Sequence, residues 1–258
     1  MSTLSVHSSA DPADHRAAAE IATEAGRLLL DLRAAVADTA TDPAELRAAG
    51  DRASHELIVA LLAQRFPDDA VLSEEGADDT ARLDAARVWI VDPLDGTREF
   101  GEAGRSDWAV HVALVVGGDV VAAAVALPGR DLTLATDPAP TLAPAWGGAP
   151  RLVVSRTRPP AVAEQLCEHL GGELVPLGSA GAKAMAVVLG DADVYAHSGG
   201  QYEWDSAAPV GVARAAGLHV SRLDGSPLVY NREEPWLPDL LICRPELAGA
   251  VLEVTRAG

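Results

Sequence analysis

The sequence is poor in several residue types, and each shortage excludes a class of protein. Aromatic residues make up only 4% of the 258 residues, so a ligand cage lined with aromatic rings is not expected. Cys167 and Cys243 are the two cysteines, and both lie in apolar surroundings. They indicate buried free thiols in a reducing compartment and exclude a disulfide framework or a zinc site. The core must be built from Ala, Val and Leu.

Long apolar runs and basic charge are also lacking. No run approaches the roughly 18 apolar residues of a membrane helix, and the N-terminal stretch lacks the basic-then-apolar order of a signal peptide. The chain has 20 Lys and Arg against 38 Asp and Glu, a net charge of −18. This balance argues against a nucleic-acid polymer or an anionic membrane as partner. We expect a cytoplasmic protein whose small anionic substrate is bound through divalent cations.

The order of predicted helices and strands differs between the two halves of the chain. In the first part, residue periodicity predicts helices followed by a mostly antiparallel sheet: helices 13–36 and 52–66, and strands ending at 73, 91, 116, 127 and 136. The second part alternates: strands 152–155, 173–176, 192–195, 220–221 and 240–243, with helices 160–170, 182–189 and 204–216 between them. Four prolines and two glycines in residues 138–150 mark the change. We therefore expect an α+β lobe (1–145) stacked on an α/β lobe (146–258).

The stretch Asp92-Pro93-Leu94-Asp95-Gly96-Thr97 is the centre of interest. It follows the apolar run 88–91, so it is expected to be a tight turn at the end of a buried strand. Two carboxylates three positions apart at a strand end repel each other unless a cation lies between them. A solvated turn is the alternative for this stretch taken alone.

Other acidic residues strengthen the metal hypothesis. Glu74 follows a short strand, Asp205 begins a predicted helix, and Asp51 precedes helix 52–66, where it is first interpreted as an N-cap. Residues at the ends of helices and strands can meet in one cleft even when they are far apart in the sequence. Because all these ligands are oxygen donors, the expected metal is Mg²⁺, with Mn²⁺ as a substitute, and the expected chemistry is phosphoryl transfer to water. His111, inside an apolar strand, is expected to be a satisfied core histidine.

Three separated motifs carry a resemblance to a known family. Glu74-Glu75, the stretch 92–97 and Trp204-Asp205-Ser206 occur in the order typical of the inositol monophosphatase superfamily. The resemblance implies a layered αβαβα sandwich, of the type shared with fructose-1,6-bisphosphatase. It also implies a lithium-sensitive phosphatase that binds two or three Mg²⁺ ions, and it allows a homodimer.

The same resemblance implies roles for individual residues. Glu74, Asp92 and the carbonyl of Leu94 match the ligands of the first metal, and Asp92, Asp95 and Asp205 match those of the second. Asp51 matches the acid that, with the Thr97 hydroxyl, orients and deprotonates the attacking water. Capping and catalysis are compatible, so catalysis becomes the favoured role of Asp51. The N–H groups of Gly96 and Thr97 would hold the scissile phosphate.

Further motifs point to one branch of the superfamily. The inositol-selective pattern has a glutamate seven residues before the last Asp, where this chain has Ser198. Residues 98–100, 178–183 and 201–205 instead resemble the CysQ-type branch, which removes the 3′-phosphate of 3′-phosphoadenosine 5′-phosphate during sulfate assimilation. These stretches contain the candidate substrate contacts Arg98, Ser179, Lys183, Tyr202 and Glu203, with Tyr202 or Trp204 as the candidate for contact with adenine and a core role favoured for Trp204. Arg156, just after strand 152–155, is a weaker candidate for holding the second phosphate.

Lys183 is singled out by the residues themselves. It is the only lysine of the chain and lies in the first turns of a helix that follows a glycine-rich loop, which favours anions. A cation there can hold the 5′-phosphate that is not cleaved; the alternative is a solvated surface lysine.

Two other functions stay open. The same metal core can serve inositol monophosphatase or fructose-1,6-bisphosphatase activity. A non-catalytic protein that binds Mg²⁺ or a nucleotide is the more remote alternative, because the set of acidic residues is complete.

Overall fold

The first helix begins as its sequence predicts. The computed structural model describes residues 10–37 and 42–256, and helix α1 spans Pro12–Ala35. The Asp11 carboxylate accepts a hydrogen bond from the Ala13 N–H (2.8 Å), and the Asp14 carboxylate accepts one from the Asp11 N–H (3.0 Å). This reciprocal capping, with Pro12 in the first turn, satisfies N–H groups that the helix itself cannot pair.

The second helix begins earlier than predicted. Helix α2 spans Pro43–Arg65 and is capped by Asp42, whose carboxylate accepts from the Ala44 N–H (2.8 Å). The N-cap role expected for Asp51 is therefore wrong, because Asp51 lies inside the helix. Asp42-Pro43 is the same start signal as in α1, and good helix formers follow it. Between the two predicted helices the notable segment is 38–50, which its polar residues and Asp42-Pro43 predict to be a loop. Residues 38–41 lie outside the described part, and the rest is this cap and helix.

The first sheet has five strands in the order β1-β2-β3-β4-β5. Strand β1 is parallel to β2, and the other neighbours are antiparallel, as the predicted hairpins require. Strand β2 is buried along its whole length. The strands span these residues: β1 Ala70–Ser73, β2 Val88–Asp95, β3 Ala109–Val116, β4 Asp119–Leu127 and β5 Leu132–Ala135.

The second sheet is mixed, with the order β7-β6-β8-β10-β9. Its strands span these residues: β6 Arg151–Ser155, β7 Glu173–Leu177, β8 Val194–Tyr202, β9 His219–Ser221 and β10 Trp236–Cys243. The helices of this half span the following: α4 Ala161–Leu170, α5 Ala180–Leu189, α6 Glu203–Ala215 and α7 Ala248–Thr255. Strand β8 runs directly into α6, so the end of this strand and the first turn of the helix are one continuous segment.

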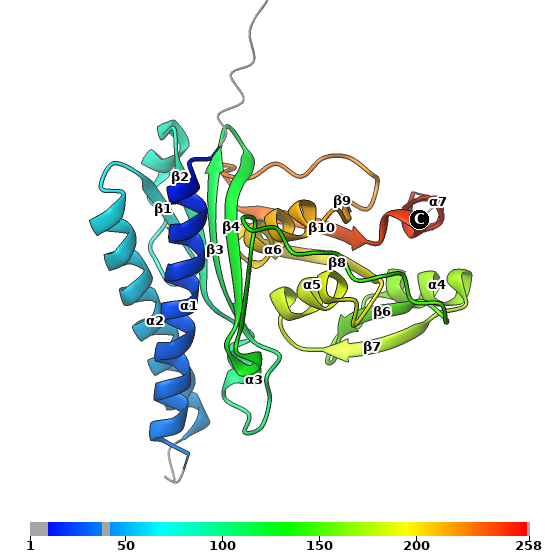
Figure 1. Cartoon of the computed structure of the whole chain (residues 1–258), viewed down its shortest axis with the longest axis horizontal. Helices are drawn as coiled ribbons and strands as arrows, with labels where there is room; N and C mark the ends of the chain where they lie inside the picture. Colours follow the sequence, from blue (N-terminus) through cyan, green and yellow to red (C-terminus); the bar gives the residue numbers. More distant parts are fainter. Residues whose placement is uncertain (1–9, 38–41, 257–258) are drawn as a thin grey trace, which may run out of the picture.

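The helices and sheets stack in five layers (Figure 1). Helices α1 and α2 cover one face of the first sheet, α5 and α6 contact strands of both sheets, and α4 and α7 pack together beyond the second sheet. Small side chains permit this close stacking on both faces of β4. Ala123 shares a core with Ala207 and Ala208 of α6, while Ala122, Ala124 and Ala126 belong to the core beneath α1 and α2. The expected αβαβα sandwich is confirmed.

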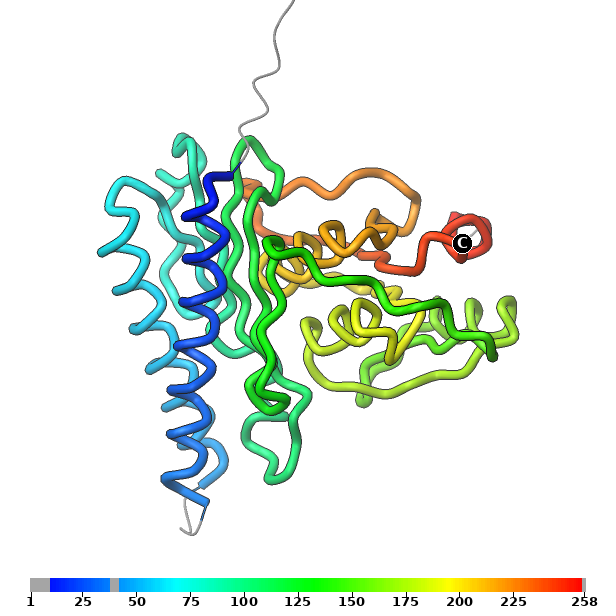
Figure 2. Tube along the Cα trace, viewed as in Figure 1, coloured from blue at the N-terminus to red at the C-terminus, as the bar shows by residue number. Residues whose placement is uncertain are grey.

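The segment between the two sheets crosses from β5 to β6, in the stretch where the composition changes (Figure 2). One apolar core joins residues of both sheets, so the separation into lobes 1–145 and 146–258 stays a prediction. Cys243 is buried and free as expected, whereas Cys167 is only half-buried. Within the described residues no helix is long and apolar enough to span a membrane.

The revised start of α2 can be tested by comparing two alanine variants. Asp42→Ala removes the cap and should lower the free energy of unfolding by about 1 kcal/mol. Asp51→Ala replaces a mid-helix residue by the best helix former and should cause no such loss. Urea denaturation of the metal-free protein measures both. An equal loss in the two variants would contradict the earlier helix start.

Candidate metal centre and active site

The ends of two parallel strands bring the first carboxylates together. Ser73 of β1 pairs with Val91 of β2, so Glu74 and Asp92 follow side by side at the same edge of the sheet. Asp95 is the last residue of β2. Parallel strands end at one edge, which explains why residues 18 or more positions apart in the chain become neighbours here.

Asp205 approaches this edge from the middle layer. It lies in the first turn of α6, where its carboxylate accepts a hydrogen bond from the Tyr202 N–H (2.7 Å). One carboxylate oxygen each of Asp92, Asp95 and Asp205 lies within 4.8 Å of the others. We call these three residues the acidic cluster. Of the predicted metal ligands, these three side chains are thus brought together.

Two residues of the cluster, Asp92 and Asp205, and the neighbouring Glu74 have pKa values above those of ordinary carboxyl groups. Burial, followed by the charges of Glu74, Asp95 and Asp205, raises the pKa of Asp92 well above its usual value. Burial and the neighbouring acids raise the pKa of Glu74 to about 7, against the opposing hydrogen bond with Asp92. Burial and the charge of Asp95 raise the pKa of Asp205 to about 6. A cation bound here would relieve this repulsion.

Asp95 is the exception, because protein donors stabilise its charge. Its carboxylate accepts hydrogen bonds from the Ser179 hydroxyl (2.5 Å) and from the N–H groups of Ala180 (3.2 Å) and Gly181 (2.6 Å), at the start of α5. Burial alone would raise the pKa of Asp95. The contact with His111 and the hydrogen bonds from Ser179 and Gly181 outweigh burial and hold the pKa of Asp95 at about 2. Asp95 therefore ties the end of β2 to the helix layer.

His111 belongs to this site, which the sequence did not reveal. It is buried as expected, but its Nε2 lies 3.2 Å from a carboxylate oxygen of Asp95, and its Nδ1 lies 3.0 Å from the carbonyl oxygen of Trp204. Burial lowers the pKa of His111, and contact with Asp95 raises it by more. The pairing of His111 with Asp92 across β2 and β3 places it here. No signal in the sequence shows this register.

Asp51 and Thr97 form the second part of the site. From the middle of α2, Asp51 accepts a hydrogen bond from the Thr97 hydroxyl (3.3 Å), and that hydroxyl also lies 3.0 Å from the Leu94 carbonyl oxygen. Burial and the charge of Glu75 raise the pKa of Asp51 to about 6. A carboxylate with such a pKa is suited to accept a proton near neutral pH. Leu94 also lies here, with its carbonyl against Thr97.

Gly96 allows the turn between Asp95 and Thr97. Its φ is +84°, in the left-handed region, and an added Cβ would lie 2.9 Å from the Cβ of Ser179. A side chain would therefore be strained and would push α5 away. Gly96 is the N-cap of the short helix α3 (Thr97–Phe100), and this helix start has no side-chain cap.

The donor set fits hard divalent cations. All side-chain ligands are carboxylates, which suit Mg²⁺ and Mn²⁺, and neither cysteine lies in the cluster. The raised pKa values indicate an uncompensated excess of negative charge. Asp92, Asp95, Asp205 and Glu74 would hold the ions.

The predicted arginine contacts differ in their surroundings. Arg98 is exposed, and within residues 10–37 and 42–256 its side chain has no hydrogen bond or ion pair. Arg156 donates to Glu99 (2.6 Å) and Glu102 (2.5 Å). Arg98 is therefore available to an anion, while Arg156 is already paired with two carboxylates.

The other predicted substrate contacts are mostly internal. Lys183 is 5% exposed, and its ammonium donates to the carbonyls of Gly178 (2.5 Å) and Ser179 (2.8 Å). It is not the solvated surface lysine of the alternative. Direct contact of Lys183 or Ser179 with substrate stays a prediction.

Glu203 is the most deeply buried of the predicted substrate contacts, and its contact with substrate stays a prediction. It is fully buried, and its two oxygens accept from the N–H groups of Asn231 (2.7 Å) and Arg232 (3.0 Å). Glu203 thus anchors the loop before β10. The sequence placed it next to Asp205 but could not show the distant loop that covers it.

Comparison with known proteins agrees with this geometry. The profile of the inositol monophosphatase family matches residues 10–254. The chain belongs to the inositol monophosphatase family. The family is metal-dependent, in agreement with the acidic cluster.

Individual members of the family are similar over most of the chain. A 3′-phosphoadenosine 5′-phosphate phosphatase of Mycobacterium leprae is 51% identical, covering 96% of this chain and 95% of that protein. The 3′(2′),5′-bisphosphate nucleotidase CysQ of Escherichia coli is 32% identical, covering 73% and 81%. The crystal structure of CysQ from Bacteroides thetaiotaomicron superposes with a TM-score of 0.74 at 29% identity, covering 90% and 97%.

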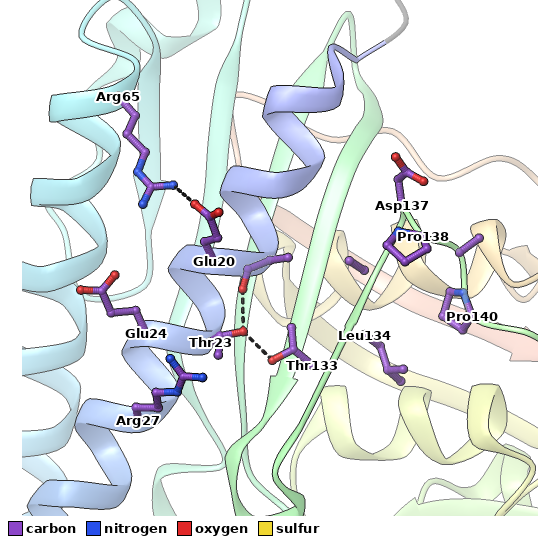
Figure 3. Close-up of a pocket in the computed structure, with 13 residues that line it drawn as sticks. Glu20, Thr23, Glu24, Arg27, Arg65, Thr133, Leu134, Asp137, Pro138 and Pro140 are labelled. Carbon is purple, nitrogen blue, oxygen red and sulfur yellow. Dashed lines mark hydrogen bonds and ion pairs between the residues drawn. The ribbon is translucent and has the colours of Figure 1, made fainter.

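A separate groove lies between α1 and β5 (Figure 3). Its volume is about 880 Å³, and it is lined by residues such as Glu24, Arg27 and Asp137. Glu20 forms an ion pair with Arg65 on one side (2.6 Å), and Thr23 contacts Thr133 on the other (2.7 Å). None of the predicted site residues of this family member lines the groove.

The pKa values predict how pH changes stability. Folding raises the pKa of Glu74, Asp205 and Asp51, so the metal-free folded protein binds more protons than the unfolded chain. Its stability should therefore fall as pH rises from about 4 to about 7. Mg²⁺ binds the deprotonated groups, so the rise in melting temperature on adding Mg²⁺ should grow over this range. Thermal denaturation with and without Mg²⁺ measures both.

Asp95 does not affect stability in this pH range. Its lowered pKa means that its contribution to the stability of the folded protein is lost only as pH falls towards 2. Asp119→Asn, at an exposed position of β4, is the control and should keep the wild-type profile. An Mg²⁺ effect that is independent of pH would contradict the assignment of these raised values to the metal centre.

Proposed function

We propose that this protein is a Mg²⁺-dependent phosphatase that removes the 3′-phosphate of 3′-phosphoadenosine 5′-phosphate, giving AMP and phosphate. The observation that carries the proposal is the 51% identity, over nearly the whole chain, to a mycobacterial phosphatase named for this substrate. The 32% identical CysQ, named as a 3′(2′),5′-bisphosphate nucleotidase, supports the same class of substrate.

The acidic cluster supports metal-assisted hydrolysis. Glu74, Asp92, Asp95, Asp205 and the carbonyl of Leu94 would hold two or three divalent cations. When bound, the cations neutralise phosphate charge and lower the pKa of water. The net charge of −18 makes this neutralisation necessary, because the substrate is itself a polyanion.

The chain's own residues then orient the reactants. Asp51, with its pKa near 6, and the adjacent Thr97 hydroxyl can hold a water and accept its proton. The N–H groups of Gly96 and Thr97 would donate to the phosphate that is cleaved. The exposed Arg98 is suited to the second phosphate; Lys183, Ser179 and Arg156 would first have to release their present partners.

Several finer properties belong to the same proposal. Mg²⁺ is the proposed physiological cation and Mn²⁺ its substitute, with inhibition by lithium. A cytoplasmic place in sulfate assimilation follows from the proposed substrate. The charge of the chain supports a small-molecule substrate over a nucleic-acid polymer, and a homodimer is compatible with the fold.

A substrate panel tests the proposed reaction. Phosphate release is measured with 3′-phosphoadenosine 5′-phosphate, inositol 1-phosphate and fructose 1,6-bisphosphate, each with Mg²⁺ and with a chelator. We expect kcat/KM for the bisphosphonucleotide to exceed the other two by at least about tenfold, and the chelator to abolish turnover. Asp92→Asn should remove activity because Asp92 is shared by the metal sites, whereas the surface variant Asp119→Asn should keep it.

Two results would contradict the proposal in different ways. If inositol 1-phosphate or fructose 1,6-bisphosphate is hydrolysed faster than 3′-phosphoadenosine 5′-phosphate, the protein belongs to another branch of the family. Failure to hydrolyse any of the three, while Mg²⁺ still raises the melting temperature, would favour the non-catalytic binding protein.

A further inference from the structure

Three aromatic side chains meet where β8 runs into α6. Tyr202 ends β8, Trp204 lies in the first turn of α6, and Trp236 begins β10 as the cross-strand partner of Tyr202. The rings of Tyr202 and Trp204 are stacked, with centroids 4.6 Å apart and planes at 10°. Trp236 meets Tyr202 at 5.2 Å and 82°, so it stands perpendicular to the stack. We call these three residues the aromatic cluster.

The aromatic cluster is open to solvent. Tyr202 is 45% exposed and Trp236 38%, whereas Trp89 and Trp108 are fully buried. Trp204 is half-buried and packs against the central core. Because Trp204 covers one face of the Tyr202 ring, the exposed area of Tyr202 lies on its other face and edge. In a chain with only 4% aromatic residues, such an exposed group needs an explanation other than core packing.

The backbone is shaped to hold the perpendicular ring. Gly200 has a φ of +85°, and an added Cβ would lie 1.7 Å from the Trp236 ring. The indole therefore lies directly over the backbone of β8, in space that only glycine leaves free. The position of Trp236 is thus fixed by the fold.

The aromatic cluster adjoins the metal centre. The Tyr202 N–H donates to the carboxylate of Asp205 (2.7 Å), and the Trp204 carbonyl lies 3.0 Å from His111 Nδ1. The base and the 3′-phosphate of a nucleotide are attached to the same ribose. A surface that binds the base must therefore lie close to the site that holds the phosphate, as Tyr202 does.

We propose that the aromatic cluster binds the purine ring of the substrate, which stacks on the free face of Tyr202 against the indole of Trp236. This inference rests on the proposed function and adds Trp236 as a specificity-determining residue. Stacking suits this acidic protein because it attracts a base without adding positive charge. Aromatic stacking changes nucleotide affinity by roughly tenfold or more per base.

Equilibrium binding measurements separate the contribution of the base to affinity from that of the phosphate. Calorimetry compares AMP, the product, with ribose 5-phosphate, which has the same phosphate and sugar but no base. With Mg²⁺ present, the wild-type protein should bind AMP at least about tenfold more tightly. In Tyr202→Leu and Trp236→Leu, which keep apolar bulk but lose the ring, the ratio of the two affinities should fall towards one. Tyr202→Phe keeps the ring and should keep the ratio.

Trp146→Leu is the matched control. Trp146 is 58% exposed, lies over Arg151 (5.1 Å) and is not part of the aromatic cluster. Its variant should keep the wild-type affinity ratio. Melting temperatures establish that each variant is folded. The comparison of AMP with ribose 5-phosphate on the wild-type protein tests the purine site even if a variant does not fold.

The outcomes separate this inference from the proposed function. If the wild type binds AMP no more tightly than ribose 5-phosphate, or if both leucine variants keep the ratio, the purine site is overturned even when 3′-phosphoadenosine 5′-phosphate is hydrolysed. If the ratio behaves as expected but this substrate is not hydrolysed, the proposed reaction fails and the purine site stands.

Discussion

The structure depends on how it accommodates like charges at the end of β2. Asp92 is 1% exposed and Asp95 7%, and both lie beside Asp205. Charges this close in a buried place are strongly unfavourable unless they are neutralised or hydrogen-bonded. The protein offsets part of the repulsion itself: the start of α5 donates to Asp95, and His111 contacts the same carboxylate. Burial and the remaining repulsion raise the pKa of Asp92 and of Glu74, and a bound cation would relieve that repulsion.

This arrangement makes the layers of the fold interdependent. The first sheet supplies Glu74, Asp92 and Asp95, while Asp205 comes from α6 between the two sheets. Hydrogen bonds from Ser179, Ala180 and Gly181 to Asp95 bind the other helix of that layer to the site. The acidic cluster thus forms only when the helix layer is packed on the first sheet, in agreement with the apolar core that they share. Stability and function are coupled at this point.

The sequence predicts the parts of the site that local chemistry encodes. Asp92 and Asp95 lie at a strand end whose apolar run is unmistakable. The alternation of elements indicates an α/β part stacked on an α+β part, whereas the layered αβαβα fold is implied by the family resemblance. The start of α2 was missed, although Asp42-Pro43 repeats the signal of α1. His111 and Glu203 could not be placed, because their contacts depend on strand register and on a loop far along the chain. Pairing between distant segments leaves no trace in a single sequence.

The position of bound metal tests the central claim most directly. A crystal soaked in Mn²⁺ and measured at the manganese absorption edge shows the ions as peaks of anomalous difference density. The account predicts peaks between the carboxylates of Asp92, Asp95 and Asp205, with Glu74 as a further ligand. Mn²⁺ bound only to surface carboxylates elsewhere, with no peak among these residues, would contradict it.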